Sequence, residues 1–144
     1  MKNILYIIAA SLALLTTACS DSDDRPVNTT PEKLDGSEWY GECEDDKTQN
    51  KYAATLTFGN DGTCTWVLRD EIGDLFSSTQ YLYEYNSPNV TIYLSEPDAE
   101  TGDLKAAFNG YVLDKDQATI GGRNVYTMWL YDTQHNPAAY FWQY

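Results

Sequence analysis

The chain contains few of the residue types on which most enzyme centres depend. It has a single histidine, His135, and three cysteines among 144 residues. One imidazole without a neighbouring cysteine nucleophile can complete neither a catalytic triad nor a typical zinc site. Carboxylates are plentiful, but the sequence singles out no two with the different environments that acid and base roles require. We therefore predict that the protein is not an enzyme, uses no cofactor and no metal, and carries His135 as a solvated turn residue.

Basic residues are also scarce. Nine Lys and Arg stand against 22 Asp and Glu, which gives a net charge of -13. Such a surface repels phosphate backbones, so the composition argues against nucleic-acid binding. The acidic loops 96–103 and 70–74 contain the oxygen ligands and the glycine that calcium binding needs, but neither has EF-hand spacing. We interpret both as loops that are acidic for solubility.

Long apolar runs are limited to the start of the chain. Residues 4–15 form one such run, Lys2 precedes it, and small residues at 16–18 follow it directly before Cys19. This order is typical of a secretory signal. The run of about a dozen residues is shorter than the ~20 that a spanning helix needs. We therefore predict that residues 1–18 are a signal peptide that is removed.

Residues 15–19, with the sequence LTTAC, resemble the lipobox of bacterial lipoproteins, with Thr16 where Leu is usual. The resemblance implies that Cys19 is lipidated and anchors the mature chain to a membrane. Residues 20–24, SDSDD, resemble the acidic export signal of surface lipoproteins in one group of Gram-negative anaerobes. We expect an outer-membrane lipoprotein that faces the cell exterior. The alternatives are the periplasmic face, and an ordinary signal peptide with Cys19 as a plain thiol.

The rest of the chain is divided into a tether and one domain. Residues 19–33 are polar and almost without apolar side chains, so we expect a disordered acidic tether. From residue 34 to 144, period-two segments rich in Tyr, Trp, Val, Ile and Thr alternate with turn signals, and no helical period occurs. We predict an all-β domain, an antiparallel meander of eight or nine strands that closes into a barrel, with a β-sandwich as the second choice. The expected strands are 38–44, 52–59, 63–69, 78–85, 90–95, 104–113, 117–121, 125–131 and 138–143.

Turn residues set the expected pairing. Asn60-Asp61-Gly62 predicts a tight hairpin, and residues 114–116 (DKD) predict another turn between two late strands. The resulting register places Cys43 near Tyr52, and Cys64 near Phe58, at opposite ends of the intervening strand. Since a disulfide needs Cα atoms within ~7 Å, this register argues against a bond between the two cysteines.

Two segments resemble lipocalin-like domains. Residues 34–41 (LDGSEWYG) resemble the opening strand, where a Gly and a Trp mark the closed end of the barrel, although two residues rather than one separate Gly36 from Trp39. Residues 54–66 resemble the strand, Asp-Gly turn and strand hairpin of small lipocalin-like bacterial lipoproteins. The resemblance implies that Trp39 plugs the barrel floor and that Arg123 packs over it. Independently of any family, such a ring can donate its N–H to a backbone carbonyl.

Aromatic residues are abundant, with twelve Tyr and four Trp. Tyr81, Tyr83 and Tyr85 alternate along one expected strand and share a face. Amphipathic rings in a cavity are usual in sites for sugars and molecules of mixed polarity, so these three are candidate ligand-binding residues. The alternative is that strands favour Tyr for its β propensity.

Two functions remain open at this stage. The first is a non-enzymatic module that binds a small molecule or glycan fragment at the barrel mouth. The second is an interaction or inhibitor module with a filled barrel, which meets a partner protein through its loops.

Overall fold

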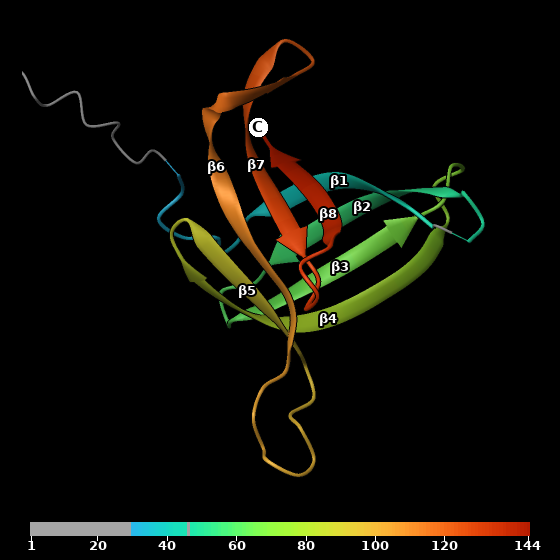
Figure 1. The fold of residues 1–144 in the computed structure, drawn as a ribbon. Helices are drawn as coiled ribbons and strands as arrows, with labels where there is room; N and C mark the ends of the chain where they lie inside the picture. The colour runs from blue at the N-terminus through green and yellow to red at the C-terminus, as the bar shows by residue number, and fades with distance from the viewer. Residues whose placement is uncertain (1–29, 46) are drawn as a thin grey trace, which may run out of the picture.

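The computed structural model describes residues 30–45 and 47–144 as an all-β domain (Figure 1). The strands are β1 (Glu38–Glu44), β2 (Lys51–Phe58), β3 (Thr63–Arg69), β4 (Leu75–Asn86), β5 (Asn89–Leu94), β6 (Ala106–Ile120), β7 (Arg123–Tyr131) and β8 (Pro137–Gln143). The predicted signal peptide, Cys19 and the acidic residues 20–24 lie outside the described residues. Within the described ranges no helix has the length and apolarity needed to cross a membrane.

The strands form a closed barrel in which each strand pairs antiparallel with its neighbours in sequence. β1 and β8 complete the ring, with Gly41 opposite Phe141. This confirms the predicted meander and its closure. The predicted register is also confirmed, because Cys43 lies opposite Tyr52 and Cys64 lies opposite Phe58. Both thiols are free.

One strand differs from the prediction. The expected turn at residues 114–116 is wrong, because β6 runs without interruption from Ala106 to Ile120 and the nine expected strands become eight. The polar residues form an irregularity instead: Leu113 pairs with Thr127 and Ala118 pairs with Val125, so the β6 residues between them face a single β7 residue. Residues 114–116 are therefore part of a bulge in β6. Polar residues are compatible with a bulge as well as with a turn.

The core lies inside the barrel and is built from the inward-facing side chains of the strands. Side chains alternate between buried and exposed along β1 and β2, as expected for strands with one wet face. The fully buried members include Trp39, Leu56, Phe58, Ile92, Met128, Leu130 and Phe141. Leu34, which precedes the first strand, is also 0% exposed and belongs to this core.

Residues Thr30–Ser37, here called the strap, lie across one end of the barrel. Backbone hydrogen bonds join the N–H of Gly36 to the Phe58 carbonyl at 2.8 Å and the N–H of Phe58 to the Ser37 carbonyl at 2.9 Å. Thr30 and Pro31 also contact β4 and the turn after it, so the last residues of the predicted tether, residues 19–33, belong to the strap. We call this the closed end. The open end carries the loops β1–β2, β3–β4, β5–β6 and β7–β8 (Figure 1).

Candidate functional site

Trp39 lies inside the barrel at the closed end. Its ring is 0% exposed, and its Nε1 donates a 2.9 Å hydrogen bond to the hydroxyl of Ser37. Ser37 in turn donates to the carbonyl of Leu34, so the indole reaches a strap carbonyl through a hydroxyl rather than directly. Arg123, at the start of β7, is exposed, and its guanidinium lies 5.9 Å from the ring centroid of Tyr144.

The three candidate tyrosines share the inner face of β4, as predicted, but they contact different groups. The Tyr83 hydroxyl lies 2.6 Å from the carboxylate of Asp35, and the Tyr85 hydroxyl donates to the Pro31 carbonyl at 2.8 Å. Burial, and then the hydrogen bond to Asp35, raise the pKa of Tyr83 well above its usual range. Tyr83 and Tyr85 thus hold the strap and border a hollow of about 250 Å³ beside it.

Tyr81 faces a different hollow, which we call the inner hollow. It has a volume of about 240 Å³, and its walls are Trp66, Leu68, Ser77, Thr79, Tyr81 and Phe108. The ring of Phe108 lies 5.2 Å from that of Trp66 and 6.0 Å from that of Tyr81, measured between centroids. Aromatic walls with a few hydroxyls are the usual lining of small-molecule sites.

The inner hollow exists because β5 is short. Pairing between β4 and β5 stops where Tyr81 lies opposite Leu94, so Ser77 and Thr79 have no β5 residue beside them. The chain then leaves the ring as the β5–β6 loop before Ala106 rejoins it. The barrel wall is therefore incomplete next to the hollow.

Trp66 carries the one buried side-chain polar atom without a hydrogen-bond partner among the residues that the structure describes, its Nε1. An unpaired buried donor costs about 1–3 kcal/mol, so native proteins rarely keep one. Its ring also contacts Phe141 in the core, with centroids 5.2 Å apart. The Trp66 ring thus forms a wall between the inner hollow and the core, and its N–H is shielded from solvent and has no partner. Spacing along the sequence does not indicate this feature.

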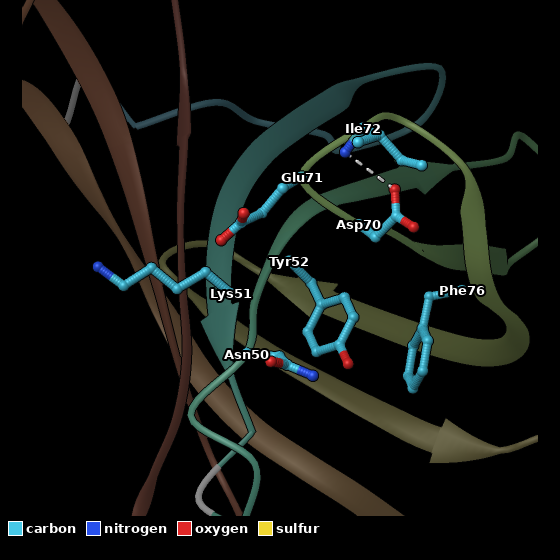
Figure 2. A pocket seen from close by; sticks show the side chains of 7 residues that line it. All are labelled: Asn50, Lys51, Tyr52, Asp70, Glu71, Ile72 and Phe76. Carbon is cyan, nitrogen blue, oxygen red and sulfur yellow. Dashed lines mark hydrogen bonds between the residues drawn. The ribbon is translucent and has the colours of Figure 1, made fainter.

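A third hollow of about 370 Å³, the rim hollow, lies at the open end (Figure 2). Tyr52 and Phe76 form its apolar wall, with ring centroids 4.3 Å apart. The exposed Ile72 and the charged Lys51 and Glu71 also line it. The rim hollow and the inner hollow are neighbours along β4, because Phe76 lines the rim hollow and Ser77 lines the inner hollow.

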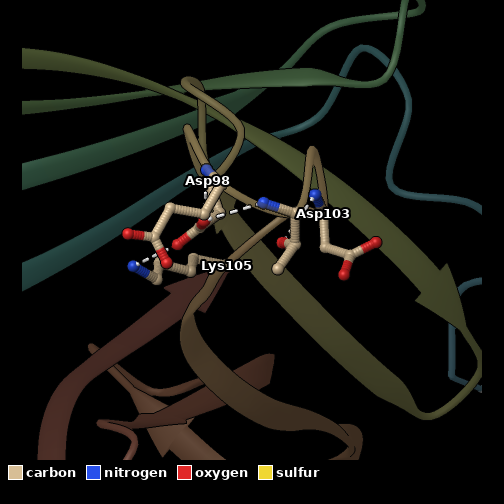
Figure 3. Close-up of polar contacts among 5 residues, drawn as sticks. Asp98, Asp103 and Lys105 are labelled. Atoms are coloured by element: carbon tan, nitrogen blue, oxygen red, sulfur yellow. Dashed lines mark hydrogen bonds and ion pairs between the residues drawn. The ribbon is translucent and has the colours of Figure 1, made fainter.

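The carboxylates of Asp98 and Asp70 accept hydrogen bonds from within their own acidic loops. Asp98 forms an ion pair with Lys105 at 2.7 Å and accepts backbone hydrogen bonds from Glu100 and Thr101 (Figure 3). Lys105 is the main cause that lowers the pKa of Asp98. Asp70 likewise accepts from two backbone N–H groups of its own turn. Across the described part of the chain, no cluster of three or more His, Cys, Asp or Glu side chains is placed to hold a metal ion.

Comparison with known proteins adds no identity: no family model, curated protein or solved structure matches the chain.

Proposed function

We propose that this protein is a lipid-anchored, lipocalin-like binding protein of the bacterial outer membrane, which captures a small amphipathic molecule in its inner hollow without chemical conversion. The barrel topology and the lipobox-like segment support the general class. The inner hollow adjoins the rim hollow of the open end along β4, and this position supports the binding activity, since ligand sites in barrels occur preferentially in their mouths.

The aromatic lining of the inner hollow carries the proposal, since Trp66, Tyr81 and Phe108 all contribute rings to its wall. The indole N–H of Trp66 is shielded from solvent and has no partner, so a ligand acceptor that reached it after a small shift of the wall would gain a hydrogen bond. Phe108 and Tyr81 would pack against the apolar part of the same ligand. The site thus suits a molecule with a ring system or short apolar body and one acceptor atom.

Charge narrows the ligand class further. The rim hollow next to the site carries Asp70 and Glu71 against the single cation of Lys51. The chain as a whole has a net charge of -13, which repels anions before they reach the mouth. A neutral or cationic ligand is therefore favoured over a carboxylate or phosphate.

Nile red is a suitable probe, since it is neutral, planar and carries a carbonyl acceptor. We expect the segment from Thr30 to Tyr144 to bind it with a rise in probe fluorescence. Trp66→Phe keeps an aromatic wall but removes the donor, so its affinity should fall roughly fivefold, as for the loss of about 1 kcal/mol. Trp129→Phe makes the same chemical change on the outside of the barrel and is the matched control.

Equal affinities for the two variants would show that the indole donor has no part in binding. Absence of any fluorescence change with the unmodified segment would contradict the binding site itself.

A further inference from the structure

The barrel carries a second group of aromatic rings on its outer surface. These side chains lie on four strands that are consecutive around the barrel, β6, β7, β8 and β1. We call them the outer aromatic face, and its members are Tyr40, Tyr111, Trp129, Tyr131, Tyr140 and Trp142. Six such rings on the wet side of a small acidic domain need an explanation, since contiguous exposed apolar patches usually mark interaction sites.

The outward direction of these rings follows from strand alternation. Phe141 is 0% exposed in the core, so Tyr140 and Trp142 on either side of it point outward. Met128 and Leu130 are buried in the same way around Trp129. The outer rings are partly exposed, and Tyr40 is 41% exposed.

Register makes the face continuous across the strands. Tyr140 lies opposite Trp129, which lies opposite Tyr111 on the next strand, and Tyr40 lies opposite Trp142. The rings of Trp129 and Tyr140 have centroids 4.7 Å apart. With strands ~4.8 Å apart, this row spans about 14 Å from β1 to β6, which suits an extended ligand better than a compact one.

One end of the face is hollowed. Tyr111 and Tyr131 stack with centroids 6.1 Å apart and hydroxyls 3.3 Å apart, beside a hollow of about 210 Å³. Asn109, Asp132 and His135 also line this hollow, so hydrogen-bonding groups surround the ring pair. His135 is exposed in the β7–β8 turn, as the sequence predicts.

Charge selects among the occupants of this face. Glu38 and Glu42 on β1 and Asp132 after β7 border it, and the Tyr40 hydroxyl lies 2.6 Å from Glu38. Acidic borders on a chain of net charge -13 repel anionic lipid, nucleic acid and a second copy of the same chain. Aromatic faces pack against the C–H faces of sugar rings, and carboxylates accept hydrogen bonds from sugar hydroxyls. We propose that the outer aromatic face binds a neutral oligosaccharide chain, independently of the inner hollow.

The four tryptophans make a direct test. Trp129 and Trp142 lie on the outer aromatic face, Trp66 lines the inner hollow, and Trp39 is buried at the closed end. The full chain, labelled with nitrogen-15 in detergent micelles, gives one indole N–H signal for each. Addition of cellohexaose, maltohexaose or mannohexaose should shift the signals of Trp129 and Trp142 and leave those of Trp39 and Trp66 in place.

Variants and an anionic probe complete the experiment. Tyr140→Ala should weaken binding of the neutral hexasaccharide about tenfold, and Tyr111→Ser should do the same if the first variant loses its folded spectrum. Trigalacturonic acid should cause no shift. The proposal is overturned if no neutral probe shifts the outer indole signals, if the Trp66 signal shifts instead, or if the anionic probe binds equally well. A shift confined to Trp66 would support the inner hollow while removing the outer site.

Discussion

The phenol of Tyr83 lies 2.6 Å from the carboxylate of Asp35, and this contact joins the inner face of β4 to the strap. The same hydroxyl lies 2.9 Å from the carbonyl oxygen of Gly59, so one side chain links three segments at the closed end. The ring also meets Phe58 edge-on, with centroids 4.7 Å apart. The closed end is thus held by polar contacts that sit directly on the core.

Tyr83→Phe should destabilise the domain by about 1–2 kcal/mol, because it removes the hydroxyl that satisfies strap and loop groups but keeps the ring. Tyr93→Phe is the matched control, since its hydroxyl contacts Glu84 on the exposed surface and its loss should cost under ~0.5 kcal/mol. Urea titration measures both. Equal midpoints for the two variants would mean that the strap contact adds nothing to stability.

Ser37→Ala should leave the buried Nε1 of Trp39 without its acceptor. The expected cost is about 1–3 kcal/mol, the penalty for an unsatisfied buried donor. Trp39→Ala, which empties the core position, should cost ~3–5 kcal/mol and unfold much of the population. The exposed Ser78→Ala serves as control in the same denaturation series. A Trp39→Ala midpoint equal to that of the unmodified protein would rule out the buried floor role.

Gly41→Ala should weaken the closure between β1 and β8. A Cβ at this position would lie 2.5 Å from the carbonyl oxygen of Tyr140 and 2.8 Å from the Phe141 ring, so the backbone must separate. Gly73→Ala meets no atom within 4 Å and carries only the strain of its positive φ, about 1–2 kcal/mol. In thermal unfolding, the melting temperature of Gly41→Ala should be well below that of Gly73→Ala. The opposite ranking would show that β1 and β8 do not pack this closely.

Alkaline pH should destabilise the domain through Cys64. Burial raises the pKa of this thiol from 9.0 to about 12, so the folded chain keeps a proton that the unfolded chain loses. Its contribution is therefore complete below pH 9 and is lost as the pH rises toward 12. Cys64→Ala should flatten the fall in urea midpoint over this range, whereas the exposed Ser78→Ala should not. An unchanged slope in Cys64→Ala would place the alkaline sensitivity elsewhere.

Cys19→Ala should release the protein from membranes of a bacterium that processes lipoproteins, because the proposed anchor is attached to this sulfur. Cys43→Ala, a substitution of the same kind inside the barrel, should remain in the membrane fraction. Radioactive palmitate should label Cys43→Ala but not Cys19→Ala. Palmitate incorporation into Cys19→Ala would contradict the lipoprotein assignment.

The strands were predictable because their periodicity and turns are local. β1 and β3 begin and end where alternation predicts, and the Asn60-Asp61-Gly62 turn has the positive φ that its glycine permits. The error at residues 114–116 has a local cause as well. Polar residues mark a bulge as readily as a turn, and only the pairing of Leu113 and Ala118 with β7 separates the two.

The candidate site depends on contacts that no local pattern reveals. Sequence alternation placed Tyr81, Tyr83 and Tyr85 on one face, but the strap meets Tyr83 and Tyr85 across 48 and 54 residues of chain. Trp66 was not singled out, because an unpaired indole N–H is a property of packing rather than of spacing. The outer aromatic face depends on the register of four strands relative to one another. No single segment of the sequence determines that register.

The position of the strap also sets the end of the barrel from which the preceding chain leaves. Thr30, where the described chain begins, contacts Ser87 at the closed end through their hydroxyls, which lie 2.6 Å apart. With a lipid on Cys19, residues 20–29 would join the bilayer to the closed end of the domain rather than to its open end. The inner hollow would then sample solutes of the surrounding medium rather than molecules that diffuse within the lipid.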